Sequence, residues 1–106
     1  MLSLRAKNNG RIMVHQEVED LALLLKSMSH PIRLQILCLL QEREMTVGEI
    51  RNEVQTTSAN VSQHLGVLRN QGVIGFRRDA NFIYNRITDA RVTDLITAMR
   101  RLFCRK

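Results

Sequence analysis

The chain has 106 residues, of which 44% are hydrophobic and 25% are charged, a composition typical of one globular domain. Lys and Arg outnumber Asp and Glu by 16 to 10, so the formal net charge is +6. This balance favours a polyanionic partner, with nucleic acid first. The longest apolar run, residues 21–25, is far shorter than the roughly 20 residues of a membrane span. We therefore expect a cytoplasmic protein with no membrane partner.

The N-terminal segment, residues 1–16, is predicted to be a weakly ordered basic arm, because residues 8–10 (Asn-Asn-Gly) break a helix. A first helix is predicted over residues 17–28. Its apolar residues at helical spacing are Val18, Leu21, Leu25 and Met28. Leu23 and Leu24 make this apolar face wider than one core contact needs. A wide apolar face on a terminal helix predicts a dimer surface.

Two further helices are predicted in the middle of the chain. The first begins at Pro31, where the missing N–H goes unused, and runs to about Glu42. It is apolar nearly all round, so we expect it at the centre of the domain. Thr46 and Glu49 then form a capping box, which predicts a short helix ending near Val54.

A tight turn at residues 55–56 separates this short helix from the next. Thr57 is predicted to cap a helix that runs to Gln71, and Gly72 follows at the C′ position. The inner apolar face of this helix consists of Val61, Leu65 and Leu68. This order of short helix, tight turn and capped helix is that of a helix-turn-helix. The second helix of that motif lies in the major groove of DNA.

The end of the chain is predicted to form a hairpin and a last helix. Residues 73–78 and 82–87 are β-prone and flank a three-residue turn at 79–81. Thr88 is predicted to cap a final helix over residues 89–104. Its apolar face consists of Val92, Leu95, Ile96, Met99, Leu102 and Phe103.

These elements predict a mainly α fold with a small β component, in the α+β class. Four helices precede a β-hairpin, and a fifth helix follows it. The hairpin directly after the helix-turn-helix is the wing of a winged helix-turn-helix. We expect residues 17–104 to form one domain that binds DNA and assembles as a homodimer.

The predicted recognition helix carries short, hydrogen-bonding side chains and no acidic residue. Its candidate DNA-contacting residues are Thr57, Ser58, Asn60, Ser62, Gln63 and His64. Gln and Asn can pair with adenine, and the helix N-terminus offers N–H groups to phosphates. His64 also borders the inner apolar face, so a packed histidine is the alternative for that residue. Arg77 and Arg78 on the wing, with Arg86 on the returning strand, suit phosphate or minor-groove contact.

Two stretches resemble a known family. Residues 25–37 (LKSMSHPIRLQIL) and 61–65 (VSQHL), followed by Leu68-Arg69, resemble the ArsR/SmtB family of winged-helix repressors over about residues 18–104. The resemblance implies a homodimer, joined through the first and last helices, that represses transcription from double-stranded operator DNA until a small inducer binds. The predicted interface residues are Val18, Leu21, Leu24, Leu25, Leu95, Met99 and Leu102.

Most members of that family sense metals, and here the sequence departs from them. Residues 46–50 (TVGEI) contain no Cys where one metal motif begins. The other common site needs an Asp-x-His start and a later His on the last helix, but the chain has Asp89-Ala90-Arg91 and no His after His64. We therefore expect no metal site and no cofactor. The chain also lacks a CxxC pair and a polar catalytic constellation, so we expect no enzyme activity and no catalytic residue.

The sequences around Cys38 (residues 37–40, LCLL) and Cys104 (residues 102–104, LFC) resemble those around the cysteines of the family branch that contains HlyU, BigR, SqrR and YgaV. That resemblance implies a thiol switch for persulfides or oxidants. Arg100 and Arg101 near Cys104 favour a reactive thiolate. A disulfide requires Cα atoms within about 7 Å of each other, which only the fold can provide. The alternatives are a metal or metalloid sensor, inert cysteines, or a winged helix that binds protein instead of DNA.

Overall fold

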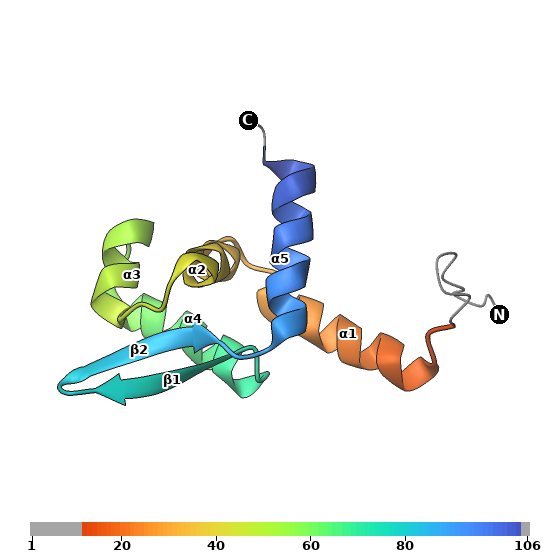
Figure 1. The fold of residues 1–106 in the computed structure, drawn as a ribbon, viewed down its shortest axis with the longest axis horizontal. Helices are drawn as coiled ribbons and strands as arrows, with labels where there is room; N and C mark the ends of the chain where they lie inside the picture. The colour runs from red at the N-terminus through yellow and green to blue at the C-terminus, as the bar shows by residue number, and fades with distance from the viewer. Residues whose placement is uncertain (1–11, 105–106) are drawn as a thin grey trace.

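The computed structural model describes residues 12–104 of the chain. Within that range it contains five helices and one two-stranded antiparallel hairpin (Figure 1). The elements in chain order are α1 (His15–Met28), α2 (Pro31–Glu42), α3 (Val47–Val54), α4 (Ser58–Asn70), β1 (Ile74–Asp79), β2 (Phe82–Ile87) and α5 (Ala90–Phe103). The predicted order is confirmed, and with it the winged helix-turn-helix fold class.

The hydrophobic core surrounds α2, as its all-round apolar sequence predicted. Ile36 and Leu37 on this helix are fully buried, and α4 directs its predicted inner face toward them. The buried core residues are Leu24, Met28, Ile36, Leu37, Leu40, Met45, Ile50, Val61, Leu65, Leu68, Val73, Ile74, Val92 and Ile96. In Figure 1, α3 and the hairpin lie at one end of the molecule and α1 at the other, with α2 between them.

Three predicted helix boundaries are confirmed by their caps. The Thr46 hydroxyl accepts from the Glu49 N–H (3.2 Å), and the Glu49 carboxylate accepts from the Thr46 N–H (2.9 Å). The Thr57 hydroxyl accepts from the Asn60 N–H at 3.0 Å. Gly72 has a φ of +79°, a conformation that costs glycine little, and it ends α4 by turning the chain toward the wing.

The N-terminal boundary differs from the prediction. α1 begins at His15, two residues before the predicted start, because the Glu17 carboxylate accepts from the Val14 N–H at 3.0 Å and caps the helix there. The last two residues of the predicted arm, residues 15–16, are therefore helical. Residues 1–11 of that arm lie outside the described part of the chain.

The apolar face predicted for α1 is only partly internal. Leu24 and Met28 are buried against the core, whereas Val18, Leu21 and Leu25 remain 37–43% exposed. The reason is that only the C-terminal part of α1 reaches the core, where its buried residues lie. The rest of the helix extends away from the domain (Figure 1).

The hairpin turn is shorter than predicted. Asp79 pairs directly with Phe82, so the turn consists of two residues and not three. Ala80 has a φ of +55°, which is unfavourable for a residue with a Cβ and is usually left to glycine in such turns. The absence of glycine there is the reason that the sequence did not indicate a two-residue turn.

The cap of α5 is also corrected. Asp89, and not the predicted Thr88, is the N-cap, and its carboxylate accepts from the Arg91 N–H at 3.0 Å. The Thr88 hydroxyl instead donates to the Gly72 carbonyl at 3.3 Å. Thr88 thereby ties the start of α5 to the end of α4.

Within residues 12–104, no single helix is both long and apolar enough to cross a membrane. α1 and α2 taken together reach the length and composition of a span, but they are bent by 95° at the break between them.

Candidate nucleic-acid interface

The outer face of α4 is polar, and the tight turn before it fixes its direction. Gln55 has a φ of +55° and its N–H donates to the Arg51 carbonyl at 2.9 Å, which ends α3 abruptly. Of the predicted DNA-contacting residues, Ser62 and Gln63 are exposed on this face. Among residues 12–104, no side-chain hydrogen bond engages either of them. Their hydrogen-bonding groups are therefore available to a ligand.

The first turn of α4 is more constrained than the sequence indicated. Ser58 and Asn60 are half-buried. Ser58 accepts a hydrogen bond from the Arg51 guanidinium (3.1 Å), and the Asn60 amide donates to the Thr56 hydroxyl (3.0 Å). These contacts orient the helix N-terminus, where Thr57 is exposed. The structure thus divides the predicted set into residues that orient the helix and residues that face solvent.

His64 corrects the sequence prediction most clearly. Its side chain is buried and does not lie on the exposed face of α4. The ring packs on that of His30, with centroids 4.3 Å apart, and Nδ1 lies 3.2 Å from Nη1 of Arg33. Burial, followed by the charges of His30 and Arg33, lowers the pKa of His64. This burial favours the packed histidine that the sequence left as the alternative over the predicted DNA contact.

The two wing arginines differ in their surroundings. Arg77 pairs with Glu44 and Asp79, and its guanidinium lies 4.7 Å from the ring centroid of Tyr84. Arg78 points to the other face of the hairpin, because neighbouring residues in a strand alternate. It is exposed and, among the described residues, has no ion-pair partner. Arg78 is therefore the freer cation of the two.

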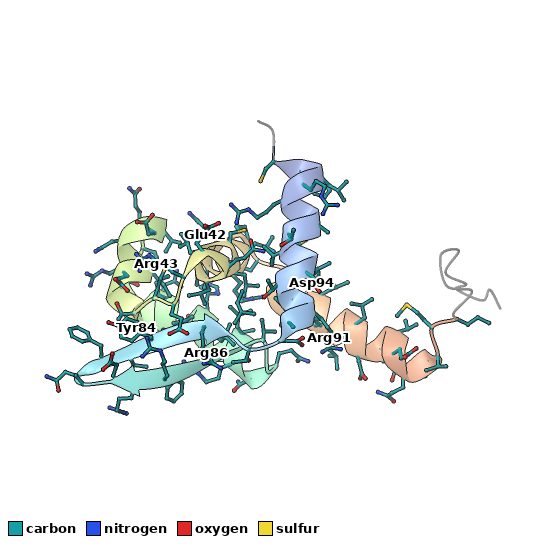
Figure 2. All side chains as sticks on the ribbon, viewed as in Figure 1. Glu42, Arg43, Tyr84, Arg86, Arg91 and Asp94 are labelled. Atoms are coloured by element: carbon teal, nitrogen blue, oxygen red, sulfur yellow. The ribbon has the colours of Figure 1, made fainter. Side chains whose placement is uncertain are left out.

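Asn85 attaches the wing to the domain, a role that sequence reasoning missed. It is 1% exposed and pairs with Met45 through both backbone groups. Its side-chain amide also donates to the Met45 carbonyl (3.2 Å) and accepts from Arg69 (3.4 Å). The available signal was a polar residue on the same face of the strand as Ile83 and Ile87, two positions away on either side. Figure 2 shows β2 with Tyr84 and Arg86 on either side of this position.

Away from this interface, α2 and α5 are joined by polar contacts beside the two cysteines. The Gln41 amide donates to the Thr93 carbonyl (3.1 Å) and the Thr97 hydroxyl (2.6 Å). Arg100 donates to the Gln41 amide oxygen (2.9 Å) and the Glu42 carboxylate (3.0 Å). These bonds fix the relative position of the helices that carry the thiols.

Cys38 on α2 is half-buried, Cys104 after α5 is exposed, and both are free thiols. Burial raises the pKa of Cys38, while the nearby Arg100 opposes that rise and Cys104 adds to it. Both Arg100 and Cys104 thus influence the ionisation of Cys38, although no disulfide joins the two thiols in this structure. Among residues 12–104, no three His, Cys, Asp or Glu side chains gather into a group that could hold a metal ion.

The predicted dimer residues fall into two groups. Val18, Leu21, Leu25 and Leu102 are exposed, as are the neighbouring Leu23 and Phe103. Leu95 and Met99 are half-buried against the core, and Leu24 is buried within the chain. Exposed leucines on both α1 and α5 leave a large apolar surface uncovered by this chain.

Comparison with known proteins agrees with this arrangement. Residues 30–75 match the family model described as "Bacterial regulatory protein, arsR family". The chain is 37% identical over 91 residues to the biofilm growth-associated repressor of Xylella fastidiosa, covering 86% of this chain and 80% of that protein. It is 35% identical over 99 residues to the transcriptional activator HlyU of Vibrio cholerae, covering 90% of this chain and 92% of that protein.

Solved structures give the same result. The structure of HlyU from Vibrio cholerae matches with a TM-score of 0.83 and 32% identity, covering 87% of this chain and all (100%) of that one. The transcriptional repressor BigR from Xylella fastidiosa matches with a TM-score of 0.78 and 37% identity, covering 89% of this chain and 100% of that one. The chain therefore belongs to the arsR family of bacterial regulatory proteins.

Proposed function

We propose that this chain is a homodimeric transcriptional repressor that binds operator DNA through α4 and the wing, and that releases it when Cys38 and Cys104 are oxidised or persulfidated. The observation that carries DNA binding is the outer face of α4. It has no acidic side chain, it exposes Ser62 and Gln63, and its N-terminus is ordered by the Thr57 cap. A Gln can read adenine in the major groove.

The wing supplies the sequence-independent part of the proposed contact. Arg78 and Arg86 are exposed cations on the hairpin that follows α4. Arginines in this position suit phosphates or the minor groove. Arg77 contributes less to this contact, because Glu44 and Asp79 already neutralise it.

The proposed dimer places two such surfaces on one DNA duplex. Leu21 and Leu25 on α1 and Leu102 on α5 are apolar, exposed and outside the DNA-facing half. A surface of this kind is costly to leave in water, and a second copy would cover it. Two-fold symmetry would then set the recognition helices roughly 34 Å apart, to fit successive major grooves.

The thiol switch rests on the contact between α2 and α5. Cys104 is exposed, so a reagent meets it first, and the half-buried Cys38 is the proposed resolving thiol. The two free thiols are not close to each other in this structure, so a bridge between them requires the end of α5 to move relative to α2. With peroxide, one thiol forms a sulfenic acid and water, and the second thiol condenses with it to a disulfide and another water. With glutathione persulfide, each thiol exchanges to a protein persulfide and glutathione. Two such persulfides then condense to a trisulfide bridge and hydrogen sulfide.

A DNA-binding experiment tests the first part of the proposal. A duplex selected from a random library with the reduced wild-type protein serves as the probe, and fluorescence anisotropy gives its affinity. Gln63→Ala should weaken binding about 10–100-fold, as expected for loss of one good base contact of about 1–3 kcal/mol. Gln71→Ala, an exposed Gln at the other end of α4, is the matched control and should bind like wild type. Failure to select any duplex would overturn the DNA-binding proposal.

Mass spectrometry and the same probe test the switch. Peroxide should remove two hydrogens from the reduced protein, and glutathione persulfide should add sulfur between the cysteines. Either product should weaken DNA binding about 5–150-fold, the usual range of allosteric coupling. The Cys38→Ser and Cys104→Ser variants should each remain insensitive. Unchanged affinity of the treated wild-type protein would contradict the switch while leaving DNA binding intact.

A further inference from the structure

A cluster of His64, Arg33 and His30 links the proposed recognition helix to the rest of the domain. Arg33, on α2, donates through Nε to the Ser27 carbonyl near the end of α1, and its Nη1 lies 3.2 Å from Nδ1 of His64 on α4. The ring of His30, the N-cap of α2, packs against the His64 ring at an interplanar angle of 40°. One guanidinium therefore bridges α1 and α4.

The geometry fixes the protonation state of His64. A guanidinium can only donate hydrogen bonds, so Nδ1 of His64 must accept and must carry no proton. The neutral ring then holds its single proton on Nε2. His30 is constrained in the same way, because its Nδ1 accepts from the Ile32 N–H at 3.1 Å. A second proton on His64 would place two donors face to face beside the Arg33 cation.

We propose that His64 is a positioning residue for DNA binding: its neutral ring holds α4 against α1 and α2 through Arg33, and its protonation in acid loosens α4 and weakens DNA binding. The inference rests on the proposed contact of α4 with DNA. Ser62 and Gln63 precede His64 on the same helix, so movement at His64 would displace the side chains that face the groove.

Among residues 12–104, no carboxylate contributes to the surroundings of His64 that would stabilise an imidazolium. The described charges that affect its pKa are those of His30 and Arg33, and both act in the same direction as burial, which is the largest cause and lowers the pKa. The cationic side chains on the other elements that pack against α4 either bind other groups or lie away from His64. Arg51 on α3 donates to Ser58, Arg77 on β1 pairs with Glu44, and Lys26 on α1 lines an adjoining groove.

The sign of the effect follows from this environment. An ordinary His has a pKa of about 6.5, and the folded protein lowers the value for His64. The unfolded or loosened state therefore binds a proton more readily than the native state does. Acidification below about pH 6.5 favours the loosened state, and the stabilisation is fully present only above that pH.

The pH dependence of DNA binding tests the proposal. The probe is a duplex selected with wild-type protein at pH 7.5, and anisotropy is measured at pH 7.5 and 5.5. His64→Asn keeps an acceptor oxygen near the Nδ1 position and cannot titrate, and it retains His15 and His30. The ratio of the affinities at pH 7.5 and pH 5.5 should be about tenfold larger for wild type than for His64→Asn, a coupling near 1.4 kcal/mol. His64→Leu, which removes the acceptor of Arg33 Nη1 and leaves only the Nε contact with Ser27, should bind weakly at both pH values.

A measurement without DNA separates this proposal from the proposed function. Nitrogen NMR of the histidine rings should show the Nε2–H tautomer for His64 at pH 7.5, and hydrogen exchange in α4 should accelerate at pH 5.5 in wild type but not in His64→Asn. An Nδ1–H tautomer, or equal pH dependence of exchange in the two proteins, would overturn the role of His64. Absence of DNA binding by wild type at pH 7.5, with the NMR result as expected, would instead overturn the proposed function.

Discussion

The two ends of the molecule differ in whether a single chain provides partners for their side chains. At the end formed by α3, α4 and the hairpin, polar groups find partners: Asn85 bonds to Met45, and His64 to Arg33. At the other end, Leu23, Leu102 and Phe103 are 53–80% exposed. The buried polar groups of the first end are satisfied within one chain, although the wing also exposes Phe76 and Phe82, whereas the apolar helix residues of the second end have no partner within residues 12–104. The difference agrees with the proposed DNA contact at the first end and the proposed dimer at the second.

The largest expected effect tests assembly. Leu102→Glu places a charge at the proposed interface in both copies, and burying an unpaired charge costs about 3–5 kcal/mol. We expect the dimer dissociation constant, measured by analytical ultracentrifugation, to rise by about 1,000-fold or more, equivalent to about 4 kcal/mol. Phe82→Glu, at an exposed aromatic residue of the wing, should leave that constant unchanged. Equal effects of the two substitutions on the dissociation constant would contradict the assignment of the dimer interface to the α1 and α5 end.

The next effect concerns stability. Leu68, fully buried, anchors α4 in the core. Leu68→Ala should lower the free energy of unfolding by about 3 kcal/mol, within the usual range for a buried leucine. Val67→Ala, at an exposed neighbour on the same helix, should cost less than about 0.5 kcal/mol. Urea unfolding at one fixed protein concentration measures both, since a dimer's stability depends on concentration. A cost for Val67→Ala close to that of Leu68→Ala would contradict the role of Leu68 as the buried anchor.

A smaller effect decides which residue caps α5. Asp89→Ala should destabilise the protein by about 1 kcal/mol, and Thr88→Ala by less. The Arg91 guanidinium holds the pKa of Asp89 below its usual value near 3.8. The stabilisation is therefore present above about pH 3.8 and is lost as pH falls through the lower folded value. Asp89→Asn keeps a capping oxygen and should remove this pH dependence. A larger loss from Thr88→Ala than from Asp89→Ala in thermal unfolding would restore the sequence-based assignment.

The smallest effect separates the wing arginines. Arg78→Gln should reduce the salt slope of log K for the selected duplex by about 0.9 per protomer, the value for one lost phosphate contact. Arg77→Gln should change the slope less, because Glu44 and Asp79 already pair with Arg77. Anisotropy titrations across a range of salt concentrations measure both. Equal changes in slope would mean that DNA displaces Glu44 from Arg77.

Much of this fold could be predicted because its signals are local. The Thr46–Glu49 box, the Thr57 cap and Gly72 each act within a few residues, and each marked a helix boundary correctly. The two-residue turn at Ala80 was not predicted, because a non-glycine residue occupies the left-handed position and gives no local signal of the turn. The prediction that Thr88 caps the last helix was wrong, because the side chain of the next residue, Asp89, accepts the capping hydrogen bond instead.

The candidate site was predictable only in part. The amino-acid types on α4 identified Ser62 and Gln63 as exposed polar residues, since helical spacing sets them opposite the apolar face. His64 lies at the border of the two faces, where spacing alone gives no answer. Its burial depends on Arg33, 31 positions earlier in the chain. The pairing of Arg77 with Glu44 likewise spans 33 positions.

By itself, the sequence determined the order of helices and hairpin and the wide apolar face of α1, because periodicity and caps operate over short distances. Only the tertiary structure decided which charged and titratable groups remain free. It placed His64 against Arg33, neutralised Arg77 and left Arg78 exposed. Such outcomes depend on which distant side chains meet once the core has closed, and hydrogen bonds and ion pairs act only over a few ångströms.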